Sequence, residues 1–259
     1  MPHLTVIIPA YNEERRLPAT LASVYEYLKS LNESFEILVV DDGSLDNTAA
    51  VVESFAKEHS AVRLISYTPN QGKGHAVRVG MLAARGDLLL LDDADGSSPI
   101  YEAARLEEAI SGGADIAIGS RAKPDPSRTV KALTYRKYIG NTFNAIVQFL
   151  LLPGVYDTQC GFKMFKRGVA HDIFSVARLD GYGFDVEVLF IARLRGYGVS
   201  EVSIDWTNVA GSKVNVLTDS PKMLLDVIGI ALGAWFGRYR KLSSKVAAQA
   251  GLDGSPRKD

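Results

Sequence analysis

Two aspartates that follow a short hydrophobic segment are the residues whose chemistry is easiest to infer. Leu88–Leu91 is followed by Asp92, Asp93, Ala94 and Asp95. A short apolar run of this kind is typical of a strand buried on both faces, and open α/β sheets bind ligands outside the carboxyl ends of their strands. Asp93 and Asp95 are separated by one residue, and such a pair of carboxylates can hold Mg²⁺ or Mn²⁺. The ion then takes its other ligands from water and substrate phosphates. An Asp-rich turn that caps the next helix would look the same.

Hydrophobic periodicity and turn residues divide the first half of the chain into alternating segments. Strands are predicted at residues 4–9, 35–40, 62–67, 88–91 and 115–119, and helices at residues 17–31, 47–59, 74–85 and 101–110. This alternation is typical of an α/β fold with a mostly parallel, Rossmann-like sheet flanked by helices and joined by right-handed crossovers. The polar residues that follow the parallel strands would then meet at one edge of the sheet.

Length and composition limit the class of protein. The 259 residues are 47% hydrophobic and 23% charged, which is ordinary for a folded globular protein. The formal net charge of −1 provides no overall positive field for nucleic acid. Cys160 is the single cysteine, so there is no internal disulfide bond and no sign of an oxidising compartment. The chain leads directly into a strand at Leu4, so we expect no signal peptide and a cytoplasmic protein.

Two further segments could contact a nucleotide at the strand ends. The glycine-rich segment 70–75 contains Lys73, but its spacing matches neither a Walker A loop nor a dinucleotide-binding loop. Its glycines could serve a tight turn as well as a phosphate contact. Asp41 and Asp42 end the second predicted strand and could accept from a base N–H or a ribose hydroxyl, or act as a cap. The four histidines show no metal-ligand spacing.

Four motifs in a fixed order carry a resemblance to a known family. They are VIIPAYNEE at 6–14, VVDDGS at 39–44, NQGKG at 70–74 and DAD at 93–95. Together they resemble the inverting family 2 glycosyltransferases with a GT-A fold. Later motifs, which are GSR at 119–121, DTQCGFK at 157–163, FDVE at 184–187 and WTNVAGSK at 206–213, are similar to polyprenyl-phosphate sugar transferases, most closely the dolichyl-phosphate β-glucosyltransferases.

The resemblance extends over about residues 4–213 and has two departures. Eukaryotic glucosyl members of the family carry an N-terminal transmembrane anchor, which this sequence does not show. Ser97 occupies the position at which the mannosyl members have a Gln that binds the metal, so the resemblance does not extend to a third metal ligand at this position.

On the donor side, the resemblance implies a group of residues that hold the nucleotide sugar. These are Pro9, Tyr11, Glu13, Asp41, Asp42 and Lys73.

On the catalytic side, the resemblance implies that Asp93 and Asp95 face the diphosphate and the metal ion, with Asp95 the more direct ligand. Arg121 and Lys213 would act in catalysis and contact the acceptor phosphate, and the basic segment that begins at Arg121 adds Arg136 as a candidate contact to that phosphate. Glu187 would lie on a helix behind the site, as a contact or as support.

A basic segment and two apolar segments indicate a lipid phosphate acceptor. Residues 121–137 hold six cations against one acid, and residues 143–152 are apolar but too short to span a bilayer. Cations beside an apolar face suit a lipid phosphate at a membrane surface, whereas a solvated loop and a buried helix are the alternatives. The apolar stretch 223–237, interrupted by Asp226 and followed by cations at 238–241, could lie on a membrane, pack on the domain or contact another subunit.

These observations define three regions and one reaction. We expect a GT-A domain at 1–220, an apolar helix at 221–241 that could lie on a membrane surface, and a disordered tail at 242–259. A phosphate monoester has a second pKa near ~6 and can attack a sugar without a protein base. The hypothesis is metal-dependent, inverting transfer of glucose from UDP-glucose to a polyprenyl or dolichyl phosphate, at the cytoplasmic face of a membrane. The alternatives are mannose transfer from GDP-mannose, a soluble acceptor, or a non-catalytic nucleotide-sugar binding module.

Overall fold

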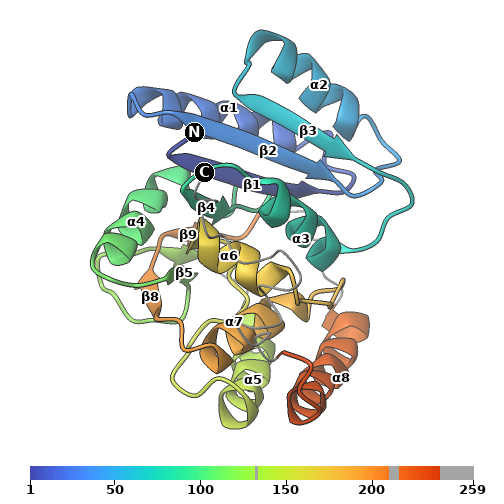
Figure 1. Ribbon diagram of the computed structural model, residues 1–259, viewed down its shortest axis with the longest axis vertical. Coiled ribbons are helices and arrows are strands. Elements are labelled where there is room, and N and C mark those ends of the chain that lie inside the picture. The colour runs from blue at the N-terminus through green and yellow to red at the C-terminus, as the bar shows by residue number, and fades with distance from the viewer. Residues whose placement is uncertain (132–133, 210–215, 240–259) are drawn as a thin grey trace, which may run out of the picture.

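A seven-stranded sheet forms the centre of the computed structural model, which describes residues 1–131, 134–209 and 216–239 (Figure 1). The strand order is β3-β2-β1-β4-β7-β5-β8. The strands are β1 (Leu4–Ala10), β2 (Phe35–Asp41), β3 (Val62–Ser66), β4 (Leu88–Leu91), β5 (Ile116–Ser120), β7 (Lys163–Lys166) and β8 (Val199–Ser203). Only β7 runs antiparallel to its neighbours β4 and β5 in this sheet. The mostly parallel α/β fold predicted from the sequence is confirmed.

Helices follow most of the strands, as the periodicity predicts. They are α1 (Leu17–Ser30), α2 (Thr48–Glu58), α3 (Lys73–Ala83), η1 (Ile100–Glu102), α4 (Ala103–Ser111), α5 (Thr134–Leu150), α6 (Arg167–Phe174), α7 (Phe184–Leu194) and α8 (Val216–Trp235). Because α8 begins at Val216, the expected domain boundary at residue 220 falls inside this helix.

The core consists of one hydrophobic layer on each face of the sheet. Side chains alternate along a strand, so Ile7 packs on one face and Val6 and Ile8 on the other. The layer that contains Ile7 also holds side chains of α3, α6 and α7. The second layer holds side chains of α1, α2 and α4, such as Leu21 and Leu106. The four leucines of β4 are buried on both faces, which explains their unbroken run.

The register of the strands brings the predicted site segments to one edge of the sheet. Ala10 at the end of β1 pairs with Asp41 at the end of β2, and the N–H of Asp92 donates to the Ile7 carbonyl at 3.0 Å. Because β7 is antiparallel, its first residue Lys163 lies opposite Leu91. The motif that precedes β7 therefore enters the same edge as the aspartates that follow β4.

Two smaller features complete the fold. A two-stranded parallel sheet pairs β6 (Val130–Lys131) with β9 (Trp206–Thr207). Helices α5 and α8 contact each other and project from the end of the molecule that is remote from α1 and α2 (Figure 1). Within the described part of the chain, no helix combines the length and hydropathy that a membrane span requires.

Candidate active site

Three acids follow β4, and burial makes them different from one another. Asp92 is 1% exposed, and its Oδ1 has no hydrogen-bond partner among the described residues. Burial, and then the negative charges of Asp93 and Asp95, raise the pKa of Asp92 well above its usual value. Asp92 is therefore enclosed in the protein, whereas the side chains of Asp93 and Asp95 are partly exposed at this edge.

Asp93 lies between a lysine and a glycine from two distant motifs. The Lys73 ammonium lies 2.6 Å from Asp93 Oδ1. A Cβ on Gly161 would lie 2.1 Å from Asp93 Oδ2, so only glycine permits this approach. Burial disfavours the ammonium of Lys73, but the charges of Asp93 and Asp185 outweigh that effect and raise the pKa of Lys73. Lys73 therefore stays cationic beside Asp93.

Asp95 is oriented by the residue two positions later. Its Oδ1 accepts from the N–H of Ser97 at 3.0 Å and from the Ser97 hydroxyl at 2.5 Å. Its Oδ2 lies 3.7 Å from Arg16 Nη1, beyond hydrogen-bond distance. The guanidinium of Arg16 also binds Glu13, with Nε 2.7 Å from Glu13 Oε2. Ser97 thus fixes Oδ1 of Asp95, and Oδ2 faces Arg16 without a hydrogen bond to it.

The remaining donor-side residues lie at the ends of β1 and β2, but two of their carboxylates have partners within the protein. Pro9 is buried in β1 and Tyr11 follows it, partly buried. Asp41 accepts from the Ser44 N–H and the Ser66 hydroxyl. Asp42 accepts from the side chain of Asn70 at 2.7 Å and from the N–H groups of residues 71 and 72 at 2.9 and 2.8 Å. Asp42 therefore holds the loop in front of α3.

The glycines around Lys73 serve close packing. Gly72 has a φ of 109°, and a Cβ on Gly72 would lie 2.4 Å from the carbonyl oxygen of Asp180. The N–H of Gly74 donates to the same carbonyl at 2.7 Å. The first N–H groups of α3 are thus used by the segment around Asp180, which favours the turn interpretation of this motif over direct phosphate binding.

Arg121 is fixed by a carboxylate and an aromatic ring. Its Nε and Nη2 donate to Asp157 at 2.7 and 2.8 Å, and its backbone N–H donates to the same carboxylate at 2.9 Å. The guanidinium carbon lies 5.2 Å from the centre of the Trp206 ring. Asp157 in turn is held by Glu201, which accepts from the Asp157 N–H at 2.8 Å. The sequence motifs contained Asp157 and Trp206, but their spacing alone gave them no role.

Two other cations of the basic segment 121–137 are bound to groups within the protein. Lys123 Nζ donates to the Glu201 carbonyl, and Arg128 Nη1 donates to the buried carboxylate of Glu102 at 2.9 Å. Arg136 falls in the first turn of α5, and its side chain lies outside the described part of the structure. Lys213 also lies outside the described residues.

A second pair of buried charges lies behind Lys73. The ammonium of Lys163 binds Asp185 and donates to the Cys160 carbonyl at 2.7 Å. Burial raises the pKa of Asp185, and the positive charges of Lys163 and Lys73 oppose that rise. Charges of alternating sign therefore lead from Asp185 through Lys73 to Asp93. Sequence reasoning quoted Lys163 and Asp185 as motif residues but did not predict their pairing.

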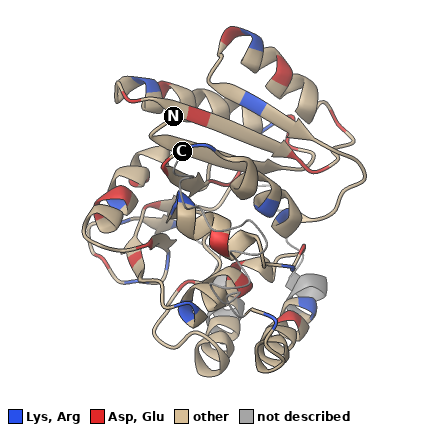
Figure 2. Ribbon diagram, in the orientation of Figure 1, with Lys and Arg blue, Asp and Glu red and all other residues tan. Residues whose placement is uncertain are grey.

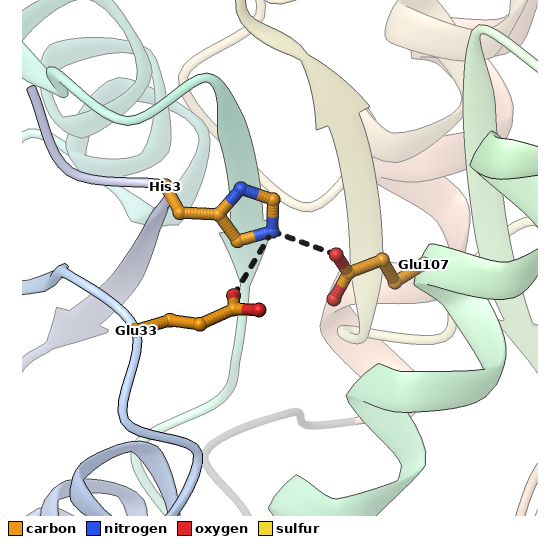
Figure 3. A group of neighbouring side chains, drawn as sticks. All are labelled: His3, Glu33 and Glu107. Carbon is orange, nitrogen blue, oxygen red and sulfur yellow. Dashed lines mark hydrogen bonds and ion pairs between the residues drawn. The ribbon is translucent and has the colours of Figure 1, made fainter.

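The oxygen ligands at the β4 edge fit a hard divalent cation that is completed by substrate phosphates. Asp93 and Asp95 offer partly exposed carboxylates, and oxygen is the ligand type that Mg²⁺ and Mn²⁺ prefer. Among the described residues, the one group of three candidate ligand side chains is His3, Glu33 and Glu107 (Figure 3). His3 precedes β1, so this group lies at the opposite end of the sheet, where His3 shares a hydrogen bond with Glu107 and lies 3.4 Å from the Glu33 carboxylate.

A cavity of about 340 Å³ opens next to Asp95. It lies between the start of α1 and the loop that follows Asp95, and its lining includes Arg15, Arg16 and Ser98. Val209, the last described residue before position 210, also lines it. The cavity thus has Arg15 and Arg16 on one side and Asp95 on the other, whereas Lys73, Asp93 and Arg121 are not among its lining residues.

Comparison with known proteins identifies a matching family and similar sequences. The family described as Glycosyl transferase family 2 matches residues 5–174. The chain is 36% identical over 249 residues to a dolichyl-phosphate β-glucosyltransferase of Dictyostelium discoideum. This match covers 90% of this chain and 76% of that protein. It is 34% identical over 249 residues to the human protein of the same name, and this match covers 90% of this chain and 77% of the human protein.

Solved structures show the same fold at lower sequence identity. One is glucosyl-3-phosphoglycerate synthase from Mycobacterium tuberculosis in complex with Mn²⁺ and UDP-glucose, with a TM-score of 0.67 and 16% identity, covering 89% of this chain and 79% of that chain. The same synthase with phosphoglyceric acid gives a TM-score of 0.68 at 18% identity, covering 89% and 80%.

Proposed function

This chain belongs to glycosyltransferase family 2, and from this premise we propose that it transfers glucose from UDP-glucose to a polyprenyl phosphate such as dolichyl phosphate. The observation that carries the proposal is the convergence of Lys73, Asp93, Asp95 and Arg121 at the carboxyl edge of the sheet. The names of the curated relatives support the glucosyl donor and the dolichyl phosphate acceptor. The place of Pro9, Tyr11 and Glu13 at the end of β1 supports the donor-side roles that we propose for them.

The reaction needs orientation and charge neutralisation more than proton transfer. A phosphate monoester is largely dianionic at neutral pH, with a second pKa near ~6, so its oxygen can attack the anomeric carbon directly. Attack opposite the leaving nucleotide inverts the anomeric centre, and an α-linked donor gives a β-linked lipid-phosphate sugar. Arg121, held in one orientation by Asp157, contacts the phosphates of the acceptor and donor, together with Arg136 and Lys213.

Asp93 and Asp95 would hold a divalent cation, Mg²⁺ or Mn²⁺, whose chemistry is to neutralise the charge of the departing nucleoside diphosphate. The ion pair with Lys73 holds the Asp93 carboxylate in place, and the hydrogen bonds from Ser97 orient Asp95. The structurally similar synthase was crystallised with Mn²⁺ and UDP-glucose, which supports testing this ion with this donor.

The acceptor lipid suggests where the protein works. Helix α8 packs on the domain through Met223, Val227 and Ile230, which are buried. Its other side exposes apolar side chains, and Figure 2 shows few charged residues along α8. The exposed members are Leu224, Leu225, Ile228, Leu232 and Trp235, and Phe236 follows the helix. We propose that this face and the neighbouring end of α5, where Phe149 is 88% exposed, lie on the cytoplasmic surface of a membrane.

A transfer assay tests the reaction. Purified protein would be incubated with Mn²⁺ or Mg²⁺, a short polyprenyl phosphate, and labelled UDP-glucose or GDP-mannose. We expect organic-phase label from UDP-glucose that requires the metal and is lost in Asp95→Ala. Label from GDP-mannose alone would assign the protein to mannose transfer, and label from neither donor would contradict a lipid-phosphate acceptor for these sugars.

Vesicle binding tests the membrane proposal separately. We expect the protein to sediment with vesicles of mixed neutral and anionic lipids, and the double variant Trp235→Ser, Phe236→Ser to stay in the supernatant. Substitution of Leu45, which is 87% exposed on the loop before α2, provides the control for loss of one exposed apolar side chain elsewhere. Equal sedimentation of all three proteins would contradict docking through α8.

A further inference from the structure

A fully buried carboxylate on α7 connects two parts of the molecule that are distant in sequence. Glu187 is 0% exposed. Its Oε2 accepts from the N–H groups of Arg178 and Leu179 at 2.9 and 2.8 Å. Its Oε1 accepts from the hydroxyl of Tyr239 at 2.8 Å. All three donors come from segments outside α7, so Glu187 joins the segment before α7 to the residues that follow α8.

The segment that binds Glu187, residues 178–180, also contacts the loop that contains Lys73. Asp180 follows directly, and its carbonyl accepts from the N–H of Gly74 at 2.7 Å. A Cβ on Gly74 would lie 2.3 Å from the carbonyl oxygen of Leu179, so the two backbones are in direct contact. Arg78 of α3 also binds the Asp180 carboxylate at 2.7 Å. The position of this segment therefore sets the position of the first turn of α3.

Lys73 lies in that first turn, between two glycines whose backbones contact Asp180. We infer that Glu187 is a positioning residue for Lys73: it fixes segment 178–180, which fixes the start of α3, which places the Lys73 ammonium 2.6 Å from Asp93. This inference rests on the proposed function, because the proposed function places Asp93 at the metal ion of the donor and Lys73 beside Asp93. It also makes Tyr239, which is 2% exposed, the second anchor of the same carboxylate.

Chemistry explains why an acid occupies this buried position. An apolar side chain would leave the N–H groups of Arg178 and Leu179 without their acceptor, and buried donors without an acceptor are strongly disfavoured. A carboxylate can accept two bonds on one oxygen and one on the other. A glutamine could do nearly the same, because its oxygen can accept both N–H groups while its NH₂ donates to the Tyr239 oxygen. An alanine can do neither.

The test compares Glu187→Ala with Glu187→Gln in the full chain. For Glu187→Ala we expect the KM for UDP-glucose and the dissociation constant for UDP with Mn²⁺ to rise about tenfold. The KM for the polyprenyl phosphate should stay unchanged, and Glu187→Gln should return the donor constants to near the wild-type values. A fall in kcat with both KM values unchanged would show that Glu187 only supports the fold, and would overturn the inference.

Gly74→Ala disturbs the same contact from the side of α3, and it serves if Glu187→Ala fails to fold. It should raise the donor constants in the same way, whereas Gly168→Ala, where an added Cβ meets nothing within 4 Å, should not. A donor KM unchanged in Gly74→Ala would contradict the proposed link.

Hydrogen exchange at the Gly74 amide needs no ligand and separates this inference from the proposed function. We expect exchange to be about tenfold faster in Glu187→Ala than in the wild type, with Glu187→Gln near the wild-type rate. Unchanged exchange would overturn the inference even if UDP binds. Conversely, a wild-type protein that binds no UDP would contradict the proposed function while the exchange data still decide the role of Glu187.

Discussion

Asp157 binds Arg121 through both carboxylate oxygens, and the backbone N–H of Arg121 donates to the same group. The side chain is thereby held in one orientation, with its guanidinium carbon over the Trp206 ring. A guanidinium that is fixed before substrate binds loses less freedom when it meets a phosphate. Asp157 is thus part of the candidate site that we propose for Arg121, although only Arg121 was predicted from the sequence to act there.

Asp157→Asn should impair activity and stability together. The amide NH₂ would face the N–H donors of Arg121, so we expect kcat/KM to fall about thirtyfold and the free energy of unfolding to fall by roughly 2 kcal/mol. Asp157 is buried, which by itself would raise its pKa, but Arg121 outweighs burial and the pKa is lowered. A lowered pKa stabilises the protein above the unfolded value near ~3.9, and this contribution is lost as the pH falls through the folded value.

Transfer kinetics and denaturant unfolding between about pH 3 and about pH 7 check this prediction. Asp115→Asn is the control, because Asp115 also has a lowered pKa but pairs with Lys166 at the other end of β5. Activity at the wild-type level in Asp157→Asn would show that Arg121 needs no fixed orientation.

Ser97→Ala should weaken metal use and leave the fold intact. The hydroxyl and the N–H of Ser97 both bind Asp95 Oδ1, and loss of a group that orients a metal ligand typically costs about tenfold or more in metal affinity. We therefore expect the Mn²⁺ concentration for half-maximal activity to rise about tenfold. Ser97→Thr keeps the hydroxyl and should stay within about twofold of the wild type. An equal loss in both variants would assign the effect to packing.

Gly161→Ala tests the placement of Asp93. An added Cβ would collide with Oδ2 of Asp93 and displace the carboxylate from Lys73. We expect transfer activity to fall at least about a hundredfold, because small displacements of reacting groups cost that much. Gly168→Ala in α6 is the matched control, and it should be active and slightly more stable. Similar activities of the two variants would remove Asp93 from the site.

Much of the fold could be predicted from the sequence because the strands are short, apolar and regularly separated. The four leucines of β4 predicted a doubly covered strand, and the register then brought Asp93 to the edge where Asp41 also lies. The antiparallel strand β7 could not be predicted, since the sequence Lys163–Lys166 carries no sign of its direction. The same strand delivers Gly161 and Lys163 to the site, so their contacts were also missed.

Residue partners within the site could not be predicted for a related reason. Motif spacing predicts which charged residues reach one edge, but it does not show which of them bind one another. One or both of Asp41 and Asp42 were predicted to hold the donor, and the sequence did not show that the Asp42 carboxylate also accepts bonds from the loop before α3. Glu187 could have been a contact or a support, and its hydrogen bonds to Arg178 and Leu179 make it a support. Such pairings depend on side-chain positions that only the folded chain defines.

The ion pairs of His3 should make stability depend on pH near neutrality. His3 Nε2 lies 2.7 Å from Glu107 and 3.4 Å from Glu33 (Figure 3), and the hydrogen bond to Glu107 raises the pKa of His3. A raised pKa stabilises the fold below the unfolded value near ~6.5, and this contribution is lost as the pH rises through the folded value. Wild type should therefore lose its advantage in Tm over His3→Gln between about pH 6 and about pH 8. Glu107→Gln should remove more of this pH dependence than Glu33→Gln, because Glu107 provides the shorter contact. A difference in Tm between wild type and His3→Gln that is constant over this range would contradict the prediction.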